Sequence, residues 1–339
     1  MIPIIGVRWR SKLGAGLFRL VSVVVLAALA SYLPQQSMAA PRMLSVAYNA
    51  QPQSPQQMAA DEVRAKLIGA AGKSFVVDER GGGALGSETA ILAATRSGAV
   101  DVSVLSGPVL GPVVPEMGMF DIPFLFRDAA HAKAVAEGPV GAGVAAKFAD
   151  KGLVLLAVGL HGFRNITNSK RPIITPDDVK GLKIRVLPNA VYQMTFKALG
   201  ADVVPMDFPL VYAALKDGRL DGQENPIATI ASSRFDEVQK HLTLTGHFFS
   251  PVAIVANRAM FEQLDPSERS ALIAAAKGAA EVTWTSKINT EKLDLLRQKG
   301  MQVVETFDRR AFVEAMKPLE PEFEKRFGKE ALAAIRSTP

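Results

Sequence analysis

The chain has 339 residues with 48% hydrophobic and 7% aromatic side chains, enough for a sizeable core and for two domains. It contains no cysteine, which excludes disulfides, cysteine nucleophiles and thiolate metal sites. The formal net charge is +6, but 4 of the 39 basic residues and none of the 33 acidic ones precede residue 40, leaving 35 against 33. Since that remainder has no Lys/Arg-rich block, no nucleic-acid partner is expected.

The first 39 residues have the pattern of a secretory signal peptide. A basic start precedes the apolar run "LVSVVVLAALASYL", and Ser37 and Ala39 are the small residues that a signal peptidase reads. We predict a signal peptide over residues 1–39 and a periplasmic location. A retained membrane anchor is the alternative, and it is disfavoured because the apolar run is shorter than the ~18–20 residues of a membrane span.

After residue 40, short apolar segments alternate with longer helical ones. The stretch "SPQQMAADEVRAKLIGAAG" predicts a helix that ends at Gly72. This alternation indicates α/β units with largely parallel sheets. The predicted strands cover residues 43–49, 74–80, 100–105, 153–160, 182–187 and 252–257.

An internal repeat relates two helix ends. The segments "AATRSGAVD" at 93–101 and "AALKDGRLD" at 213–221 share Ala-Ala, a basic residue, Gly and Asp at an offset of 120 positions. Each predicts a helix closed by a C-cap glycine and followed by a strand. Two similarly built lobes would explain the repeat and would place Glu88 and Phe208 near equivalent helix starts. Chance similarity of two helix ends is the alternative.

A long helix is predicted near the C-terminus. Capping-box residues precede a helix-compatible run over residues 266–299, which would extend about 50 Å if unbroken. Such a helix could brace both lobes. The alternative is two helices with a break near Gly278 or Asn289.

Several familiar motifs do not fit this chain. The glycines of "GGGALG" at 81–86 match G-x-G-x-x-G, but a charged segment separates them from the strand and Asp101 precedes its own strand. Dinucleotide binding is therefore disfavoured, and a turn leading into a helix is predicted. The four histidines are scattered and have no carboxylate at metal-ligand spacing. We expect no catalytic residues, no cofactor and no metal site.

The segment "DGQENP" at 221–226 places Asp221 three residues before Glu224. Such a pair can act as an acid and a base, form half of a metal site, or sit in a polar turn. Asp221 has a counterpart in Asp101, where no second acid follows. This favours a structural role for the carboxylates at a helix-to-strand corner, with Pro226 ending the strand.

Two arginines lie in or next to apolar strands. Arg164 follows the predicted strand 153–160, and Arg185 lies inside the strand 182–187. An arginine in a strand that is covered on both faces is costly unless it meets a carboxylate, which guanidinium binds in a bidentate manner. An anionic ligand and an internal Arg–Asp or Arg–Glu pair both satisfy this requirement.

The chain resembles the solute-binding proteins of TRAP transporters, the DctP-type family. The resemblance rests on "HGFRNITNSKRPIITPDDVKGLKIRV", "ALGADVVPMDF", "VYAALKDGRLDGQENP" and "FDIPFLFRD", and it covers about residues 45–330. It implies an α/β, two-lobed periplasmic binding protein fold with a cleft, hinge crossovers and a long bracing helix. The lobes are expected to comprise residues 40–161 plus 251–290 (lobe I) and 162–250 plus 291–339 (lobe II).

The same resemblance implies a ligand site. An arginine at position 185 would form the salt bridge to the ligand carboxylate, and Arg164 would add a second contact. Other side chains would bind the rest of the ligand, with Glu88 reaching it from the other lobe. The expected site residues are Arg185, Arg164, Asn225, Phe208, Glu88, His161 and Tyr48.

The implied function is capture of a small-molecule carboxylate by cleft closure, without bond-making. The expected partners are the small and large integral-membrane subunits of a TRAP permease, which carries the ligand by symport, and a monomer is expected. Dicarboxylates, 2-oxo acids, sugar acids and aromatic acids would all need the same arginine. Two alternatives remain: a sensory protein that presents the acid to a receptor, and an exported enzyme that uses Asp221 and Glu224.

Overall fold

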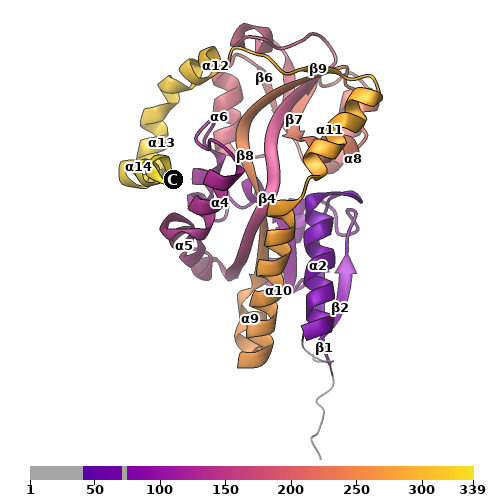
Figure 1. Cartoon of the computed structure of the whole chain (residues 1–339), viewed down its shortest axis with the longest axis vertical. Coiled ribbons are helices and arrows are strands. Elements are labelled where there is room, and N and C mark those ends of the chain that lie inside the picture. Colours follow the sequence, from indigo (N-terminus) through magenta and orange to yellow (C-terminus); the bar gives the residue numbers. More distant parts are fainter. Residues whose placement is uncertain (1–40, 71–74) are drawn as a thin grey trace, which may run out of the picture. The chain divides into compact units, whose positions relative to one another are not determined.

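The computed structural model describes residues 41–70 and 75–339. The predicted signal peptide and Gly72 lie outside the described residues. All six predicted strands are confirmed, and the described strands form one sheet with the order β2-β1-β3-β8-β4-β7-β5-β6, in which β9 pairs with β8 (Figure 1). The strands are β1 (Arg42–Ala47), β2 (Phe75–Arg80), β3 (Val102–Ser106), β4 (Leu153–Asn168), β5 (Lys183–Val186), β6 (Asp202–Pro205), β7 (Gly222–Pro226), β8 (His241–Asn257) and β9 (Gln302–Val304).

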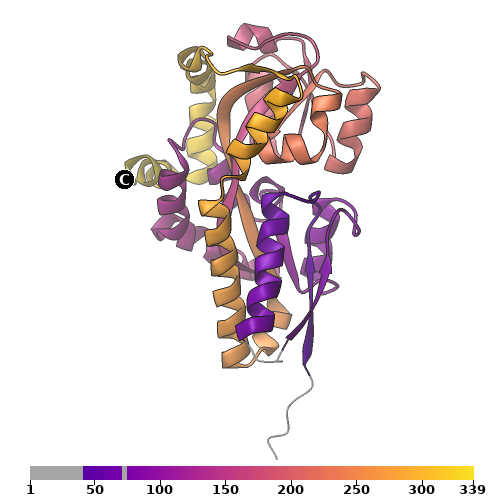
Figure 2. The ribbon, with the colours of Figure 1, turned by 45° about the vertical axis from the view of Figure 1, so that its right-hand side comes forward.

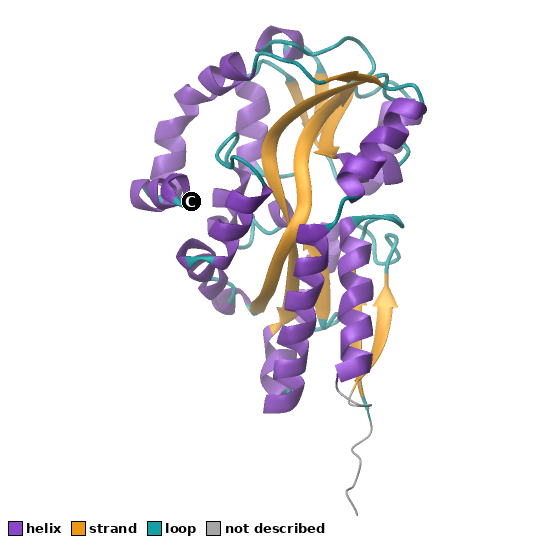
Figure 3. Ribbon diagram, viewed as in Figure 1, coloured by secondary structure: helices purple, strands orange, loops and turns teal. Residues whose placement is uncertain are grey.

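Helices cover the sheet and connect most of its strands (Figure 3). No helix in the described part of the chain is both long enough and apolar enough to cross a membrane. The α-helices are α2 (Pro55–Ala70), α3 (Glu88–Ser97), α4 (Ala129–Glu137), α5 (Pro139–Ala146), α6 (Ala190–Ala198), α7 (Val211–Lys216), α8 (Ile227–Ser232), α9 (Arg258–Gln263), α10 (Pro266–Thr285), α11 (Ile288–Gln298), α12 (Arg309–Met316), α13 (Glu320–Phe327) and α14 (Lys329–Ser337).

Two long strands join the two lobes. β4 has 16 residues and β8 has 17, and they pair in antiparallel fashion along their lengths. One end of this ladder carries β3, β1 and β2, and the other end carries β7, β5, β6 and β9. The prediction of largely parallel strands is therefore confirmed only on the two sides of this ladder. There β1 pairs in parallel with β2 and β3, and β5 pairs in parallel with β6 and β7. The centre is antiparallel because the chain crosses between the lobes along β4 and returns along β8.

The β4–β8 ladder is irregular where it passes from one lobe to the other. Its register shifts between Leu160 and Gly162. Gly162 has φ +144°, and a Cβ there would lie 2.9 Å from the Cβ of Pro226 and 2.9 Å from the amide nitrogen of Asn289. A side chain at this position would be strained and crowded, so glycine allows the bulge.

The prediction of one unbroken helix over residues 266–299 is wrong. The chain forms α10 and α11, separated at Ser286, whose backbone is extended and whose hydroxyl accepts a hydrogen bond from the N–H of Ile288 at 3.2 Å. The segment "TWTS", which ends at Ser286, combines β-branched and hydroxyl side chains, which compete with helix hydrogen bonds. Two helices with a break near Asn289, the alternative from the sequence, are confirmed. α10 packs against α2 and β4, and α11 packs against α8 (Figure 2).

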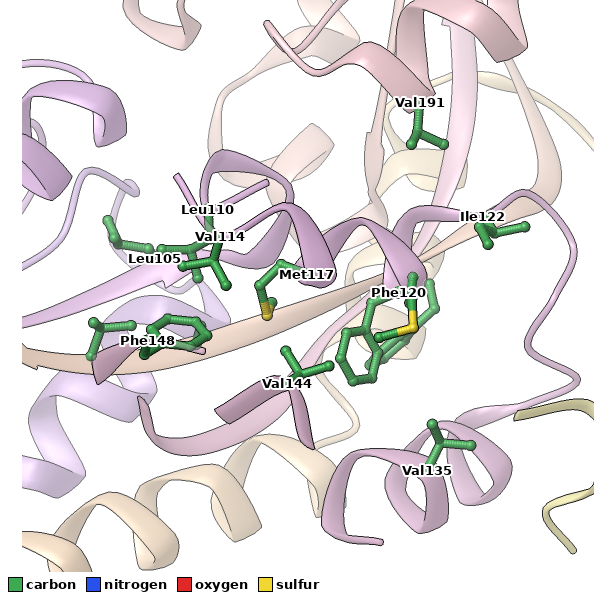
Figure 4. Packing of buried hydrophobic residues seen from close by; sticks show 14 of the residues in the cluster. Leu105, Leu110, Val114, Met117, Phe120, Ile122, Val135, Val144, Phe148 and Val191 are labelled. Atoms are coloured by element: carbon green, nitrogen blue, oxygen red, sulfur yellow. The ribbon is translucent and has the colours of Figure 1, made fainter. Parts of the chain in front are cut away.

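The largest apolar core lies under helices α4 and α5 and contains Phe120, Val135 and Phe148 (Figure 4). Side chains of α13 and α14 complete it, and His131 lies 2.9 Å from the carbonyl oxygen of Ile335. The end of the chain therefore packs against segments within 115–146. The lobe boundaries expected from the sequence assign residues 115–146 to lobe I and the end of the chain to lobe II.

The repeated helix ends form the same corner in both lobes. Asp101 accepts hydrogen bonds from the N–H and hydroxyl of Ser45 at 2.8 Å each, and Asp221 accepts one from the N–H of Lys183 at 2.9 Å. Each aspartate thus ties its helix-to-strand corner to the neighbouring parallel strand, β1 or β5. The structural role predicted for Asp221 is confirmed.

Replacing Asp221 by Ala should lower the free energy of unfolding by about 1–2 kcal/mol, because the N–H of Lys183 loses its acceptor. Urea unfolding measures this loss. The control is Asp217→Ala, whose side chain is 59% exposed, and it should change stability little. Loss of ligand affinity in a fully folded Asp221→Ala protein would contradict the structural role.

Candidate functional site

A small cavity of about 20 Å³ is lined by residues from both lobes. Six of the seven predicted site residues line it, and Tyr48 does not. A larger hollow adjoins it, shares Phe208 and Asn49 with it, and extends toward the glycine loop before α3. The lining residues are Asn49, Ala50, Gln51, Gln56, Glu88, Ser106, His161, Arg164, Arg185, Leu187, Phe208, Asn225, Thr229, Ser232 and Ser233.

Arg185 is a buried cation with unused donors. It lies on β5 with 0% of its surface exposed, and its Nε donates to the carbonyl of Met206 at 2.8 Å. Neither terminal nitrogen has a hydrogen-bond partner among the residues that the structure describes. Burial lowers the pKa of Arg185 to about 10, so the side chain is still charged at neutral pH. Because buried donors and charges are costly without partners, the guanidinium is poised for an anion.

Arg164 already has its counter-ion. Its Nε and Nη2 donate to the Glu224 carboxylate at 2.5 and 2.9 Å, and Nη2 also donates to Asn225 Oδ1 at 3.0 Å. Burial by itself lowers the pKa of Arg164, but the Glu224 carboxylate outweighs it and the net pKa is raised. Burial likewise acts to raise the pKa of Glu224, whereas Arg164 holds it below its usual value. The sequence left two partners open for a buried arginine, an anionic ligand and an internal carboxylate. For Arg164 the structure shows the internal partner, Glu224.

Strand β7 is polar yet buried at every position. Its side chains bind one another and β4: Gln223 donates to the hydroxyl of Thr167 at 2.8 Å, and Asn225 donates to Gln223 Oε1 at 2.5 Å. With its oxygen bound to Arg164, the Asn225 amide is fixed in orientation at the cavity wall. The prediction of a strand end at Pro226 is confirmed, because α8 begins at the next residue.

Glu88 brings a carboxylate to the cavity from the first lobe. It is the first residue of α3, and it accepts hydrogen bonds from the N–H and the hydroxyl of Ser106 at 2.7 and 2.5 Å. Burial raises the pKa of Glu88, although the two bonds from Ser106 act in the opposite direction.

His161 is a neutral hydrogen-bonding side chain. Its Nε2 lies 2.9 Å from the hydroxyl of Thr229, and its Nδ1 lies 3.5 Å from that of Ser250. Burial lowers the pKa of His161 to about 3, with a further contribution from Arg164. The ring therefore contributes shape and hydrogen bonds to the cavity rather than positive charge.

The structure places Tyr48 away from the cavity. Its hydroxyl donates to Glu79 at 3.0 Å, while its neighbour Asn49 lines the cavity and donates to the carbonyl of Gly86. Adjacent residues of an extended segment point to opposite sides, so only one of the two can face the ligand site.

Most of the neutral polar side chains of the lining were not predicted from the sequence. Thr229 and Ser232 on α8, and Ser233 at its C-cap, recur at i, i+3 and i+4, which places them on one side of the helix and was a usable signal. Asn49, Gln51 and Gln56 carried no comparable pattern. Within the ranges 41–70 and 75–339, no group of three His, Asp or Glu side chains is arranged to hold a metal ion.

The chain is similar to known binding proteins over most of its length. Residues 46–326 match the DctP family model, described as bacterial extracellular solute-binding protein, family 7. A solute-binding protein of Verminephrobacter eiseniae is 42% identical over 75% of this chain and 76% of its own length. The 2,3-diketo-L-gulonate-binding periplasmic protein YiaO of Escherichia coli is 38% identical over 68% of this chain and 71% of its own.

The fold also matches solved structures. A TRAP periplasmic solute-binding protein from Polaromonas sp. JS666, bound to D-erythronate, superposes with a TM-score of 0.85 and 36% identity. The match covers 87% of this chain and 98% of that protein. The two-lobed fold implied by the resemblance is therefore confirmed.

Replacing Glu224 by Gln should lower the free energy of unfolding by about 3–5 kcal/mol, because it leaves the buried Arg164 guanidinium without a counter-charge. Chemical denaturation measures the change. Glu322→Gln breaks an exposed pair with Arg326 and serves as the control, which should unfold close to the wild type. Equal midpoints for the two variants would contradict the importance of the buried pair.

His161 should make the fold sensitive to acid. Its pKa is about 3 in the folded state and about 6.5 when unfolded, so below pH 6.5 the unfolded state binds a proton that the folded state does not. The free energy of unfolding should fall by up to about 1.4 kcal/mol per pH unit between pH 6.5 and 3 through this group. In His161→Asn the acid-side slope, measured by urea unfolding at several pH values, should be shallower. Identical slopes would refute this account.

Proposed function

The chain belongs to the bacterial extracellular solute-binding proteins of family 7, and we propose that it captures a small organic acid in the cavity around Arg185. One observation carries this proposal. A fully buried guanidinium faces the cavity with both terminal nitrogens unpartnered among the described residues. A ligand carboxylate can accept from both nitrogens, which offsets the cost of the buried charge.

The side chains around Arg185 suit an organic acid that carries polar groups besides its carboxylate. Phe208 lies under the Arg185 guanidinium, 5.8 Å from ring centroid to Cζ, and gives the ligand an apolar wall. Asn225 and Thr229 offer donors and acceptors close to Arg164 and His161. The relative that binds 2,3-diketo-L-gulonate and the one solved with D-erythronate support a ligand of this kind.

The proposed mechanism is binding and closure without bond-making. Asp221 and Glu224, the carboxylates that an exported enzyme would use, are both held in internal contacts. The cavity takes its walls from both lobes, so movement at the β4–β8 crossover and at the break between α10 and α11 would open and close it. A monomeric protein would then deliver the acid to the small and large membrane subunits of a TRAP-type permease for symport.

The proposed place of action is the periplasm, after removal of a signal peptide over residues 1–39. The charge pattern of that segment and the periplasmic relatives support this location. The lobe boundary proposed at residues 161/162 falls at the register shift of β4, where Leu160 pairs with Pro251 and Gly162 with Ser250.

Replacing Arg185 by Ala should weaken binding by about 2–5 kcal/mol, a loss of roughly 30-fold to several thousandfold, because the ligand carboxylate loses its desolvated partner. A thermal-shift screen of organic acids first identifies a ligand, since binding raises apparent stability. Isothermal titration calorimetry then compares the wild type with Arg185→Ala and with Arg310→Ala, an exposed arginine outside the cavity. Unchanged affinity in Arg185→Ala would remove this residue from the site.

A further inference from the structure

The charges of the cavity define a narrower ligand class than an organic acid in general. We propose that the cavity selects acids with one carboxylate and several hydroxyls, and that Glu88 excludes a second carboxylate. This inference rests on the proposed function, because it assumes that an acid binds at Arg185.

Arg185 is the one cation of the described cavity lining that has no counter-charge bound to it. Among the described residues, the charged side chains that line the cavity are Arg164, Arg185 and Glu88. The Arg164 charge is already balanced by Glu224 through two hydrogen bonds of 2.5 and 2.9 Å. One ligand carboxylate satisfies Arg185, and a second carboxylate on the same ligand would meet no uncompensated cation in this lining.

Glu88 is held in a fixed position at the cavity wall. Its two carboxylate oxygens each accept a hydrogen bond from Ser106, at 2.7 Å from the N–H and 2.5 Å from the hydroxyl. Turning the side chain away from the ligand would break both hydrogen bonds with Ser106. Burial raises the pKa of Glu88, but both of its oxygens accept from Ser106, an arrangement that favours the ionised form. An ionised carboxylate can only accept, so it binds a ligand hydroxyl but opposes a carboxylate. Two carboxylates in contact would require one of them to take up a proton.

The other polar side chains of the cavity wall are neutral. Amides and hydroxyls, which can both donate and accept, line the cavity beside Glu88 and Arg185: Asn49, Gln51, Gln56, Thr229 and Ser232. These groups match the alternating donors and acceptors of a hydroxylated carbon chain.

Three four-carbon acids separate the features of the proposed ligand. D-Erythronate has one carboxylate and three hydroxyls, succinate has two carboxylates, and butyrate has one carboxylate and no hydroxyl. In calorimetric titrations of the wild type, as the whole chain or without its first 39 residues, D-erythronate should bind at least tenfold more tightly than either of the others. Comparable affinity for succinate would overturn the exclusion of a second carboxylate, and comparable affinity for butyrate would overturn the role of the hydroxyls.

Glu88→Gln tests the residue itself, because the amide oxygen can still accept from Ser106 while the charge is gone. The ratio of succinate to erythronate affinity should rise at least fivefold in this variant. Glu330→Gln, an exposed control outside the cavity, should leave the ratio unchanged. Glu88→Asp keeps the charge and should keep the wild-type preference. An unchanged ratio in a folded Glu88→Gln protein would overturn the role of Glu88.

Failure of the proposed function would look different from failure of this inference. If no acid of a broad library bound the wild type, or if Arg185→Ala bound erythronate as tightly as the wild type, the organic-acid site at Arg185 would be wrong and the inference would fall with it. Binding that depends on Arg185 but shows no preference between erythronate and succinate would overturn the inference alone. If Glu88→Gln did not fold, the wild-type ratios and Glu88→Asp would still decide the result.

Discussion

The buried ion pair of Arg164 and Glu224 determines what the cavity can bind. It joins β4 to β7 with bonds of 2.5 and 2.9 Å, and both side chains are at most 1% exposed. Taking two charges out of water is costly, and the close bidentate geometry is what offsets this cost. Without Glu224, two uncompensated guanidiniums would border one cavity. With it, Arg185 keeps its full attraction for one carboxylate while Arg164 acts through the orientation of Asn225.

The sequence predicted the parts of the fold in which local and tertiary preferences agree. The apolar strands, the corner aspartates and the burial of Arg185 all followed from pattern and spacing. Strand β7 was predicted only from the repeat with residues 93–101 and from Pro226, since "GQENP" has no apolar face and by itself is typical of a turn. It forms a central strand because partners from β4, including Arg164 and Thr167, satisfy its polar groups. Those partners are about 60 residues away, and no local rule includes them.

The arginines of the candidate site were predicted from their place in or next to apolar strands. Glu88, Asn225 and Phe208 were expected only from the family resemblance. No signal in the sequence distinguishes Asn49 and Gln56 from polar surface residues. Arg164 shows the limit of such reasoning: a buried arginine needs an anion, but sequence alone does not distinguish an internal glutamate from a ligand. Tyr48 shows another limit, because a shift of one residue along an extended segment reverses which side chain faces the site.

The contacts that connect the two lobes lie next to residues that line the cavity. Asn289, just after the α10–α11 break, donates to the carbonyl of His161 at 3.1 Å and accepts from the N–H of Ala228 at 2.9 Å. His161 precedes Gly162, the bulge of β4, and its ring contacts Thr229 on α8. One asparagine therefore links the helix break, the strand bulge and the start of α8. A rotation of the lobes about this point would move His161 and Thr229 relative to Glu88, so closure and the choice of ligand depend on the same few contacts.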